Sequence, residues 1–275
     1  MQLTLLGTGC PSVHPKRFGP ANLVTTKKAK ILIDCGSGVT QRLIEAKVSS
    51  AIIDALFLTH LHSDHVVDLY QLIISSWHSY RTKPWKVYGP KGTSKFVQAT
   101  MNAWKEERNL RIRYEQRPSI KAFDIKVHEF NQYGRIKIKD LTVEYFEVDH
   151  KPVKYAYGFN FYHKKKKLTM SGDTKPCDNL MKYGQLTDLL LHEVFIENEI
   201  KTFEKMRSKK TLHNVKSYHT PSTVVGKIAK IARCKKLVLT HFVPTEFNHK
   251  KLIKVVEKDF GKKPIIGKDL LKIRI

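Results

Sequence analysis

The sequence predicts an α+β protein in which two β-sheets pack face to face and helices cover both outer faces. Short apolar strand-like runs alternate with helical patterns in the first and last thirds of the chain, and a strand-rich stretch lies between them. Such a pattern is typical of two similar halves that share one layered structure. No Ser-, Gly- or Pro-rich linker and no short-period repeat divides the 275 residues, so we expect a single domain over residues 1–275.

The first third of the chain supplies strands and helices in alternation. Strands are predicted, where apolar residues dominate, over Leu3–Leu6, Leu23–Thr26, Ile31–Asp34, Ala51–Thr59 and Lys86–Tyr88. Helices are predicted over Val39–Lys47, from Asp64 onward and over Thr93–Glu107. The basic turn Lys27–Lys30 joins the second and third strands into a hairpin.

The middle of the chain is rich in strands, and the last third returns to alternation. The middle strands are Asp124–Phe130, Arg135–Lys139, Leu141–Val148, Tyr155–Tyr162 and Lys167–Ser171. The later elements are a strand over Leu189–Phe195, a helix over Pro221–Ala232, a strand over Lys236–Leu239, a helix over Glu246–Lys258 and a strand over Leu270–Ile275. The segment Ile200–His219 is basic and lacks clear periodicity, and it is predicted as a mobile loop or a helical lid.

Charge and cysteine content narrow the class of protein. Fifty basic and 25 acidic residues give a net charge of +25, a field that attracts polyanions such as nucleic acid, although a lysine-rich proteome would give the same count. The 4 cysteines lie far apart without a C-x-x-C spacing, which excludes a zinc ribbon and favours reduced thiols in a cytoplasmic protein. No apolar run reaches the ~18 residues of a membrane span, and no signal peptide is expected.

A dense run of metal-ligand residues follows the strand predicted at Ala51–Thr59. His60, His62, Asp64 and His65 fall within six residues, and Asp64 can begin the next helix. Neutral imidazole and carboxylate are the ligands that zinc takes in catalytic sites. A single histidine is most often structural, but this spacing at the end of a strand indicates a metal site.

Further candidate ligands end other predicted strands. His150 closes one strand, Asp173 follows another after a turn at Gly172, and His241 follows Leu237–Thr240. Each is a weak signal alone. Together with the first run they supply nitrogen and oxygen ligands for two neighbouring sites that share one carboxylate.

The motifs resemble those of the metallo-β-lactamase superfamily along the whole chain. The matching segments are Leu6–Gly9, Ile31–Gly36, Thr59–His65, Val148–His150, Ser171–Thr174 and Leu239–His241. The resemblance implies a four-layer αββα sandwich and two Zn²⁺ per chain, with Mn²⁺ or Fe²⁺ as substitutes. It implies one zinc on His60, His62 and His150, the other on Asp64, His65 and His241, Asp173 as the bridge, and Asp34 behind a ligand histidine.

Within the superfamily the chain is most similar to the ribonuclease Z, zinc phosphodiesterase and arylsulfatase-like group. Leu191–Val194 and Tyr218–Thr223 resemble two motifs of that group. The resemblance implies that Glu193 and His219 protonate the leaving oxygen, that Asp64 takes a proton from the attacking water, and that a metal-bound hydroxide attacks the ester. Glu193 in an ordinary salt bridge and His219 on the surface are the structural alternatives.

The substrate is less well defined than the metal site. Lys16 and Arg17 partly resemble the basic loop that lies near the substrate's 3′ end in ribonuclease Z. Ribonuclease Z proteins usually carry a long arm that grips tRNA, whereas a plain hairpin fills the space between His150 and Asp173. The leading hypothesis is a ribonuclease Z-like phosphodiesterase, with RNA as a candidate substrate and a homodimer as a candidate assembly.

Two other functions stay open. An arylsulfatase-type enzyme or a hydrolase of small cyclic phosphodiesters would use the same metals on another anionic ester. A nucleic-acid-binding protein with a structural metal site is the alternative from a different class. The complete ligand set argues against it, because structural zinc sites are closed and usually rich in cysteine.

Overall fold

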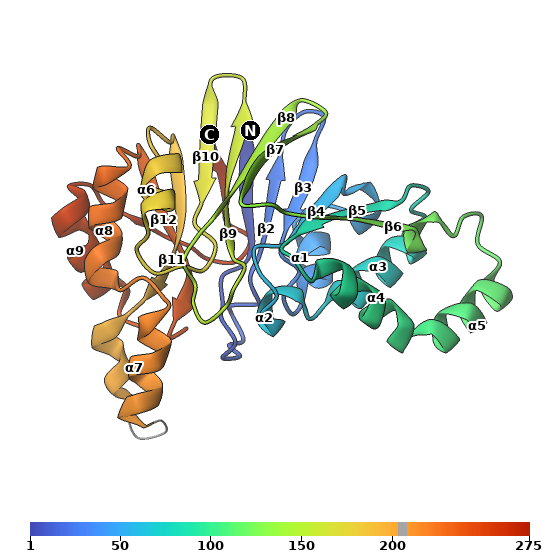
Figure 1. Cartoon of the computed structure of the whole chain (residues 1–275), viewed down its shortest axis with the longest axis horizontal. Helices are drawn as coiled ribbons and strands as arrows, with labels where there is room; N and C mark the ends of the chain where they lie inside the picture. Colours follow the sequence, from blue (N-terminus) through green and yellow to red (C-terminus); the bar gives the residue numbers. More distant parts are fainter. Residues whose placement is uncertain (203–207) are drawn as a thin grey trace.

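Two seven-stranded sheets form the centre of the molecule, as Figure 1 shows for the computed structural model. The structure describes residues 1–202 and 208–275. The first sheet has the order β14-β1-β2-β3-β4-β5-β6 and the second the order β13-β12-β11-β10-β9-β8-β7. Each sheet mixes antiparallel and parallel neighbours, with a parallel run through β3–β6 and another through β10–β13.

The strands of the first sheet are β1 (Gln2–Gly7), β2 (Ala21–Thr25), β3 (Lys30–Ile33), β4 (Ala55–Phe57), β5 (Trp85–Gly89), β6 (Ile125–Glu129) and β14 (Lys272–Arg274). The strands of the second are β7 (Tyr133–Ile138), β8 (Leu141–Glu147), β9 (Tyr157–His163), β10 (Lys166–Met170), β11 (Leu189–Phe195), β12 (Lys236–Val243) and β13 (Ile265–Ile266).

Helices cover the outer face of each sheet (Figure 1). On the side of the first sheet lie α1 (Val39–Glu45), α2 (Ser63–Val66), α3 (Leu69–His78), α4 (Thr93–Ala103) and α5 (Lys105–Glu115). On the side of the second lie α6 (Asp178–Tyr183), α7 (Lys209–Ser217), α8 (Ser222–Ile231) and α9 (His249–Phe260). Short 3₁₀ turns add η1 (Ser50–Ile52), η2 (Lys121–Phe123) and η3 (Glu197–Thr202).

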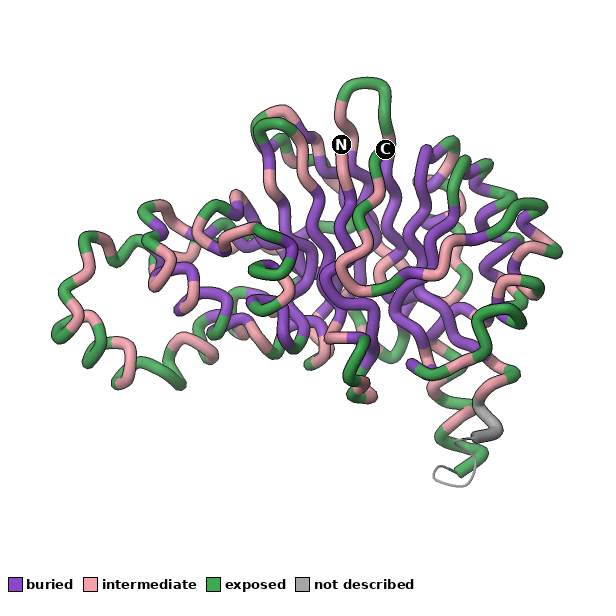
Figure 2. Tube along the Cα trace, turned by 180° about the vertical axis from the view of Figure 1, so that it is seen from behind, coloured by how far each residue is buried: buried purple, intermediate pink, exposed green. Residues whose placement is uncertain are grey.

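Three apolar layers hold the sandwich together. Phe57 and Phe159 meet in the layer between the two sheets, at a ring-centroid distance of 5.7 Å. Leu189 and Leu191 face that layer while Leu190 faces the helices outside, because successive strand residues point to opposite sides. Burial on both faces explains why β11 is a continuous apolar run, and Figure 2 shows the buried strands at the centre.

The structure confirms the predicted αββα layering and corrects several element boundaries. The strand predicted over Ala51–Thr59 is wrong in its first half, since Ser50–Ile52 forms a 3₁₀ turn that is capped by Ser49. The single helix predicted over Thr93–Glu107 is two helices, broken at Trp104. The segment Ile200–His219 contains α7, and residues 203–207 of that prediction lie outside the described residues.

One edge of the sandwich gathers the ends of the strands that matter for function. In Figure 1 the turns of the β9–β10 hairpin and both chain termini lie at the upper edge, whereas α2 and α7 lie at the lower edge. The loops that follow β4, β8 and β10 run to this lower edge. Residues far apart in the sequence therefore meet there.

Candidate metal centre

The first group of candidate ligands comes from the turn between β4 and α2. Thr59 lies two residues after the end of β4, His60 follows it, and His62 has extended backbone directly before α2 begins. Asp64 and His65 lie in the first turn of this short helix. The turn and the first helical residues bring all four predicted ligand side chains into one small volume.

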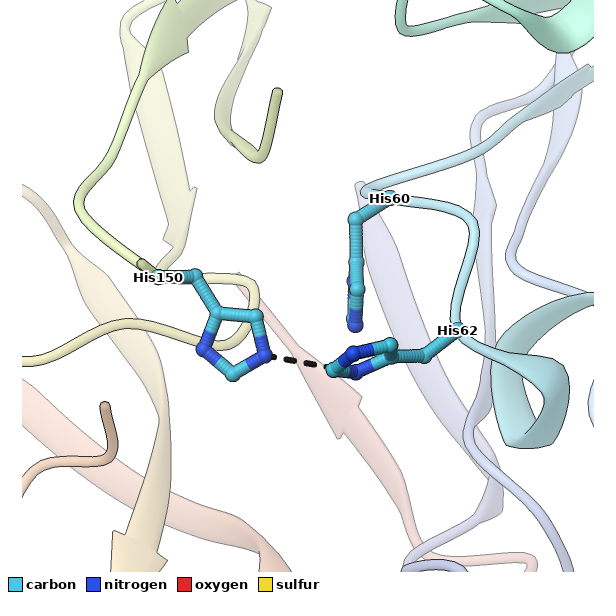
Figure 3. A group of neighbouring side chains, drawn as sticks. All are labelled: His60, His62 and His150. Atoms are coloured by element: carbon cyan, nitrogen blue, oxygen red, sulfur yellow. Dashed lines mark hydrogen bonds between the residues drawn. The ribbon is translucent and has the colours of Figure 1, made fainter. Parts of the chain in front are cut away.

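Three histidines meet at one side of this volume. The structure brings His60, His62 and His150 together with one ring nitrogen of each within 4.8 Å of the others. His150 Nε2 and His62 Nδ1 are 3.4 Å apart. Figure 3 shows the rings converging from the β4–α2 turn and, opposite to it, from the loop after β8.

A second group lies beside the first and contains the carboxylates. The structure brings Asp64, His65 and His241 together within the same 4.8 Å limit. Asp173 lies between the two groups. Its Oδ2 is 3.1 Å from His241 Nε2, 3.3 Å from His65 Nε2 and 3.9 Å from His60 Nε2.

The donor atoms fit metal ions. His60 Nε2 and His65 Nε2 are buried and have no hydrogen-bond partner among the described residues, and both face Asp173. A buried ring nitrogen without a partner costs free energy unless something binds it. Burial also lowers the pKa of His60 well below its ordinary value, which keeps the imidazole neutral and its lone pair available.

The carboxylates show that the cluster needs positive charge. Burial disfavours a proton on His65, but Asp173, Asp64 and Asp34 outweigh it and raise the pKa of that imidazole well above its ordinary value. A cation bound among these carboxylates would replace the proton and relieve the same excess of negative charge. The chemistry of the donor set, neutral imidazole with carboxylate, is that of a catalytic zinc site.

Asp34 lies behind His65, in the position that the resemblance implies. Its Oδ2 accepts a hydrogen bond from His65 Nδ1 at 2.8 Å, and its Oδ1 accepts one from Thr59 N at 2.8 Å. A proton on Nδ1 leaves the Nε2 lone pair directed at the cluster. Asp34 has φ 59°, a left-handed conformation that costs about 1–3 kcal/mol for most residues and that Asp tolerates better than most.

Two backbone irregularities aim the ligands of the second sheet. Glu193 pairs with Thr240 and Val194 with Phe242, which makes His241 the extra residue of a β-bulge with φ 45°. Gly172 turns the chain before Asp173 with φ 60°, and a Cβ there would lie 2.4 Å from the Tyr157 carbonyl oxygen. Only glycine fits that approach.

Glu193 and His219 form a buried pair beside the cluster. His219 Nδ1 is 3.1 Å from Glu193 Oε1, which also accepts hydrogen bonds from the backbone N–H of Thr220 at 3.0 Å and of Thr174 at 3.2 Å. Burial opposes a proton on His219, but the Glu193 carboxylate outweighs it and raises the pKa of the imidazole. One ring nitrogen of His219 also lies within 4.8 Å of ligand atoms of Asp173 and His241, so the pair borders the cluster.

Some of the groups that orient the candidate ligand histidines were not predicted from the sequence. The Tyr218 carbonyl oxygen lies 2.8 Å from His150 Nδ1, so the residue after α7 orients a candidate metal ligand. The Thr59 hydroxyl lies 3.0 Å from His60 Nδ1 and also donates to Asp34. A backbone carbonyl leaves no signal in the sequence, whereas Thr59 could have been found because it stands between the strand and the first histidine.

The two basic residues predicted to bind substrate differ in their surroundings. Lys16 is exposed, while Arg17 is buried with its Nη1 donating to the Thr8 hydroxyl at 2.8 Å and to the Gly267 carbonyl oxygen at 2.9 Å. The Arg17 guanidinium also lies 4.3 Å from the centre of the Phe242 ring. Its contacts within the protein fix the loop, and substrate binding by either residue stays a prediction.

Two whole-chain predictions can be compared with the structure. No helix among the described residues is long and apolar enough to cross a membrane. The 4 cysteines are free thiols, three of them buried and Cys177 partly exposed.

Solved structures with the same architecture show which fold the chain has. YhfI from Bacillus subtilis, a metallo-β-lactamase fold protein, matches with a TM-score of 0.77 at 20% identity over 99% of this chain and 98% of that one. Human tRNase Z, short form, matches with a TM-score of 0.73 at 23% identity over 100% and 99%. The chain thus has the metallo-β-lactamase fold, with the candidate metal centre at one edge of the sandwich.

Sequence comparison narrows the class to a family. The model of the Anti-Pycsar protein Apyc1 family matches residues 1–217. Ribonuclease Z of Mycobacterium bovis is 33% identical over 247 residues, 89% of this chain and 86% of the relative. Ribonuclease Z of Mycolicibacterium paratuberculosis is 32% identical over 282 residues, 100% of this chain and 98% of the relative. The chain belongs to the Apyc1 family, in the ribonuclease Z-like branch of the metallo-β-lactamase superfamily, and is a hydrolytic enzyme that acts on phosphodiester bonds.

Proposed function

We propose that the chain is a two-zinc phosphodiesterase in which His219, held by Glu193, protonates the leaving oxygen. The observation that carries the proposal is the buried 3.1 Å contact of His219 Nδ1 with Glu193 Oε1 directly beside the His/Asp cluster. A metal cluster alone supports many hydrolytic reactions. A protonated imidazole next to it supports the cleavage of esters whose leaving oxygen needs a proton.

The residues that would hold the metal pair follow from the two groups. One ion would lie on His60, His62 and His150, the other on Asp64, His65 and His241, with Asp173 between them. When bound, the pair would supply a water nucleophile of lowered pKa and would compensate charge on the phosphoryl oxygens. Asp34 would hold the His65 ring in the tautomer that ligation requires.

His219 supplies the proton in this scheme. Burial opposes the protonated imidazole, but Glu193 favours it and raises the pKa of His219, because a buried carboxylate at hydrogen-bond distance stabilises the cation. As the P–O bond breaks, His219 would give its proton to the departing oxygen and become neutral, and Glu193 would hold the ring in position for that transfer. Asp64 would accept a proton from the attacking water, as the resemblance implies.

RNA is the leading candidate substrate. Curated relatives at 31–33% identity are named ribonuclease Z, and the net charge of +25 favours a polyanion. The helix α7 adds two exposed lysines, Lys209 and Lys210, and its end leads through Tyr218 to His219 at the cluster. An RNA strand bound at the cluster would therefore pass close to α7 and its two lysines.

A small phosphodiester is the second candidate, favoured by the hairpin between His150 and Asp173. β9 and β10 pair from His163 and Lys166 without an intervening arm. An enzyme that grips only the groups next to the scissile phosphate has no need of such an arm. The family model that matches the chain is named for the Anti-Pycsar protein Apyc1 and not for ribonuclease Z, so it does not favour tRNA as the substrate.

Three substrates distinguish the candidate functions. Zinc-loaded protein is assayed on bis-p-nitrophenyl phosphate, p-nitrophenyl sulfate and a 3′-extended tRNA. Turnover of the phosphodiester is expected. Turnover of the sulfate alone would replace the proposal with an arylsulfatase. Silence on every ester together with tight RNA binding would replace it with a nucleic-acid-binding protein.

A further inference from the structure

A small internal cavity lies next to the candidate metal centre, at the end of the apolar layer between the two sheets. Its volume is about 30 Å³, and its wall includes the candidate ligands His65, Asp173 and His241. Met170 and Leu191 of the apolar layer also line it. A buried water molecule needs about 10–15 Å³, so the cavity admits water but no organic ligand.

The alternation of side chains along the strands turns polar groups into this cavity. Val24 faces the layer between the sheets, so Asn22, two residues earlier on β2, lies on the same face. Glu193 follows Leu191 on β11 by the same spacing. Asn22 and Glu193 therefore end two facing apolar rows, one on each sheet, and both line the cavity.

Three buried polar atoms of the cavity wall have no hydrogen-bond partner among the described residues. They are Asn22 Oδ1, Glu193 Oε2 and His241 Nδ1. The exposed fractions of these residues are 8%, 1% and 4%, so bulk solvent does not satisfy the three atoms. Buried polar atoms are costly unless a protein group or an ordered water binds them. Three of them on the wall of one cavity indicate a polar occupant.

The three atoms match the hydrogen-bonding capacity of one water molecule. His241 Nε2 faces the cluster, 3.1 Å from Asp173 Oδ2, so a metal bound at Nε2 leaves the ring proton on Nδ1. Nδ1 is then a donor, whereas the Asn22 amide oxygen and the Glu193 carboxylate oxygen are acceptors. A water molecule accepts one hydrogen bond from the ring and donates two to the oxygens.

We propose that a water molecule in this cavity connects His241 to Glu193 and Asn22, which makes Glu193 a positioning residue for a metal ligand. Glu193 Oε1 contacts His219 Nδ1, while Oε2 receives the water-mediated bond from His241. One buried carboxylate thus orients the proton donor and a ligand of the second group. The inference rests on the proposed metal pair and adds a second task to the proposed partner of the acid.

A crystal structure of the zinc-loaded protein, at a resolution that shows ordered water, is the direct test. We expect one water within about 2.7–3.2 Å of Asn22 Oδ1, Glu193 Oε2 and His241 Nδ1. Absence of ordered water from the cavity would overturn the proposal. A water that contacts Asn22 alone would overturn it as well, because the ligand ring and the carboxylate would then not be connected.

Zinc affinity, measured by chelator competition, reads the same contacts in solution. Glu193→Gln places an amide N–H₂ where the water needs an acceptor, and Asn22→Leu removes the other acceptor. Each is expected to weaken zinc binding by about 10-fold, the lower end of the range for groups that orient metal ligands. Asn22→Asp keeps an acceptor oxygen and should bind zinc at least as tightly as the wild type.

Two control variants separate this role from others. His219→Ala removes the contact at Glu193 Oε1 and leaves Oε2 in place, so it should keep the wild-type zinc affinity. Asn160→Leu makes the same change as Asn22→Leu at a buried asparagine of β9 that binds Glu144 and lies outside the described cavity wall. It should also keep the wild-type zinc affinity.

The failures of the two proposals are distinguishable. Wild-type protein that binds fewer than two zinc ions would overturn the metal pair. Two bound zinc ions, with unchanged affinity in Glu193→Gln and Asn22→Leu, would overturn the water-mediated contact alone. Equal weakening by His219→Ala or by Asn160→Leu would also overturn it, because the effect would then arise from the acid or from a general loss of packing.

Discussion

Replacing His219 by alanine should have different consequences for two kinds of leaving group. General acid catalysis contributes about 10²–10⁴-fold when the leaving oxygen must be protonated. We expect a loss of this size on RNA, whose leaving group is an alkoxide. On thymidine 5′-(p-nitrophenyl) phosphate the leaving phenolate is stable without a proton, so the same variant should lose far less.

Glu193→Gln tests the same pair through pH. The amide oxygen of the introduced glutamine can still accept the hydrogen bonds of Thr174, Thr220 and His219, but the substitution removes the negative charge that raises the pKa of His219. A hydrogen bond to a charged group contributes about 1.5–3 kcal/mol, which equals about 1–2 pKa units at 1.36 kcal/mol per unit. Activity on RNA falls as pH rises through the pKa of His219, so the alkaline limb should move to lower pH by about 1–2 units.

The assay is the pH profile of kcat/KM for both substrates with wild type, His219→Ala, Glu193→Gln and the control Glu197→Gln. Glu197 lies at the start of η3, and its carboxylate accepts a hydrogen bond from the Thr223 hydroxyl. It is not one of the candidate ligands. The Glu197→Gln variant should keep the wild-type profile. Full activity of His219→Ala on RNA, or an alkaline limb of Glu193→Gln at the wild-type pH, would refute the assignment of the acid.

Three further outcomes follow from the contacts of the site. Asp34→Asn should weaken zinc binding about 10–100-fold in a chelator competition, because the His65 imidazole loses the carboxylate behind it; unchanged affinity would contradict this role. Arg17→Met should lower the free energy of urea unfolding by about 1–3 kcal/mol, since two buried acceptors lose their donor; a raised KM without loss of stability would instead assign Arg17 to substrate binding. The slope of log binding constant against log salt concentration for single-stranded RNA is negative. Lys209→Glu with Lys210→Glu should make it less steep by about 1.4, at about 0.7 for each of two lost phosphate contacts. The same double change in the turn 164–165, at the opposite edge, should leave the slope unchanged.

Much of the fold could be predicted because its signals are local. The αββα layering follows from strand patterns that alternate with helices, and the β4–α2 turn concentrates four candidate ligands in six residues. The predicted boundaries of helices and strands were wrong where tertiary contacts or a single capping side chain determine where the element begins or ends. The helix expected from Glu246 begins at His249, because the Asn248 side chain caps it by accepting from Lys251 N.

In the site, too, features fixed by neighbouring residues could be predicted, whereas features fixed by distant parts of the chain could not. His150, Asp173 and His241 could be placed at strand ends, but their convergence on the β4–α2 turn required the family resemblance. The bulge at His241 and the left-handed backbone of Asp34 have no sequence signature, since both are imposed by the packing of neighbouring strands. The burial of Arg17 could not be predicted either, because its acceptors are Thr8, 9 residues before it, and Gly267, 250 residues after it.

The central claim is that hydrolysis depends on two zinc ions held by the two groups of ligands. The most direct test is titration of metal-free protein with zinc while the hydrolysis of bis-p-nitrophenyl phosphate and the metal content per chain are followed together. Activity should reach its maximum at two zinc ions per chain, and His65→Ala should bind no more than one and lose activity. Full activity with one zinc ion, or without any, would contradict the account.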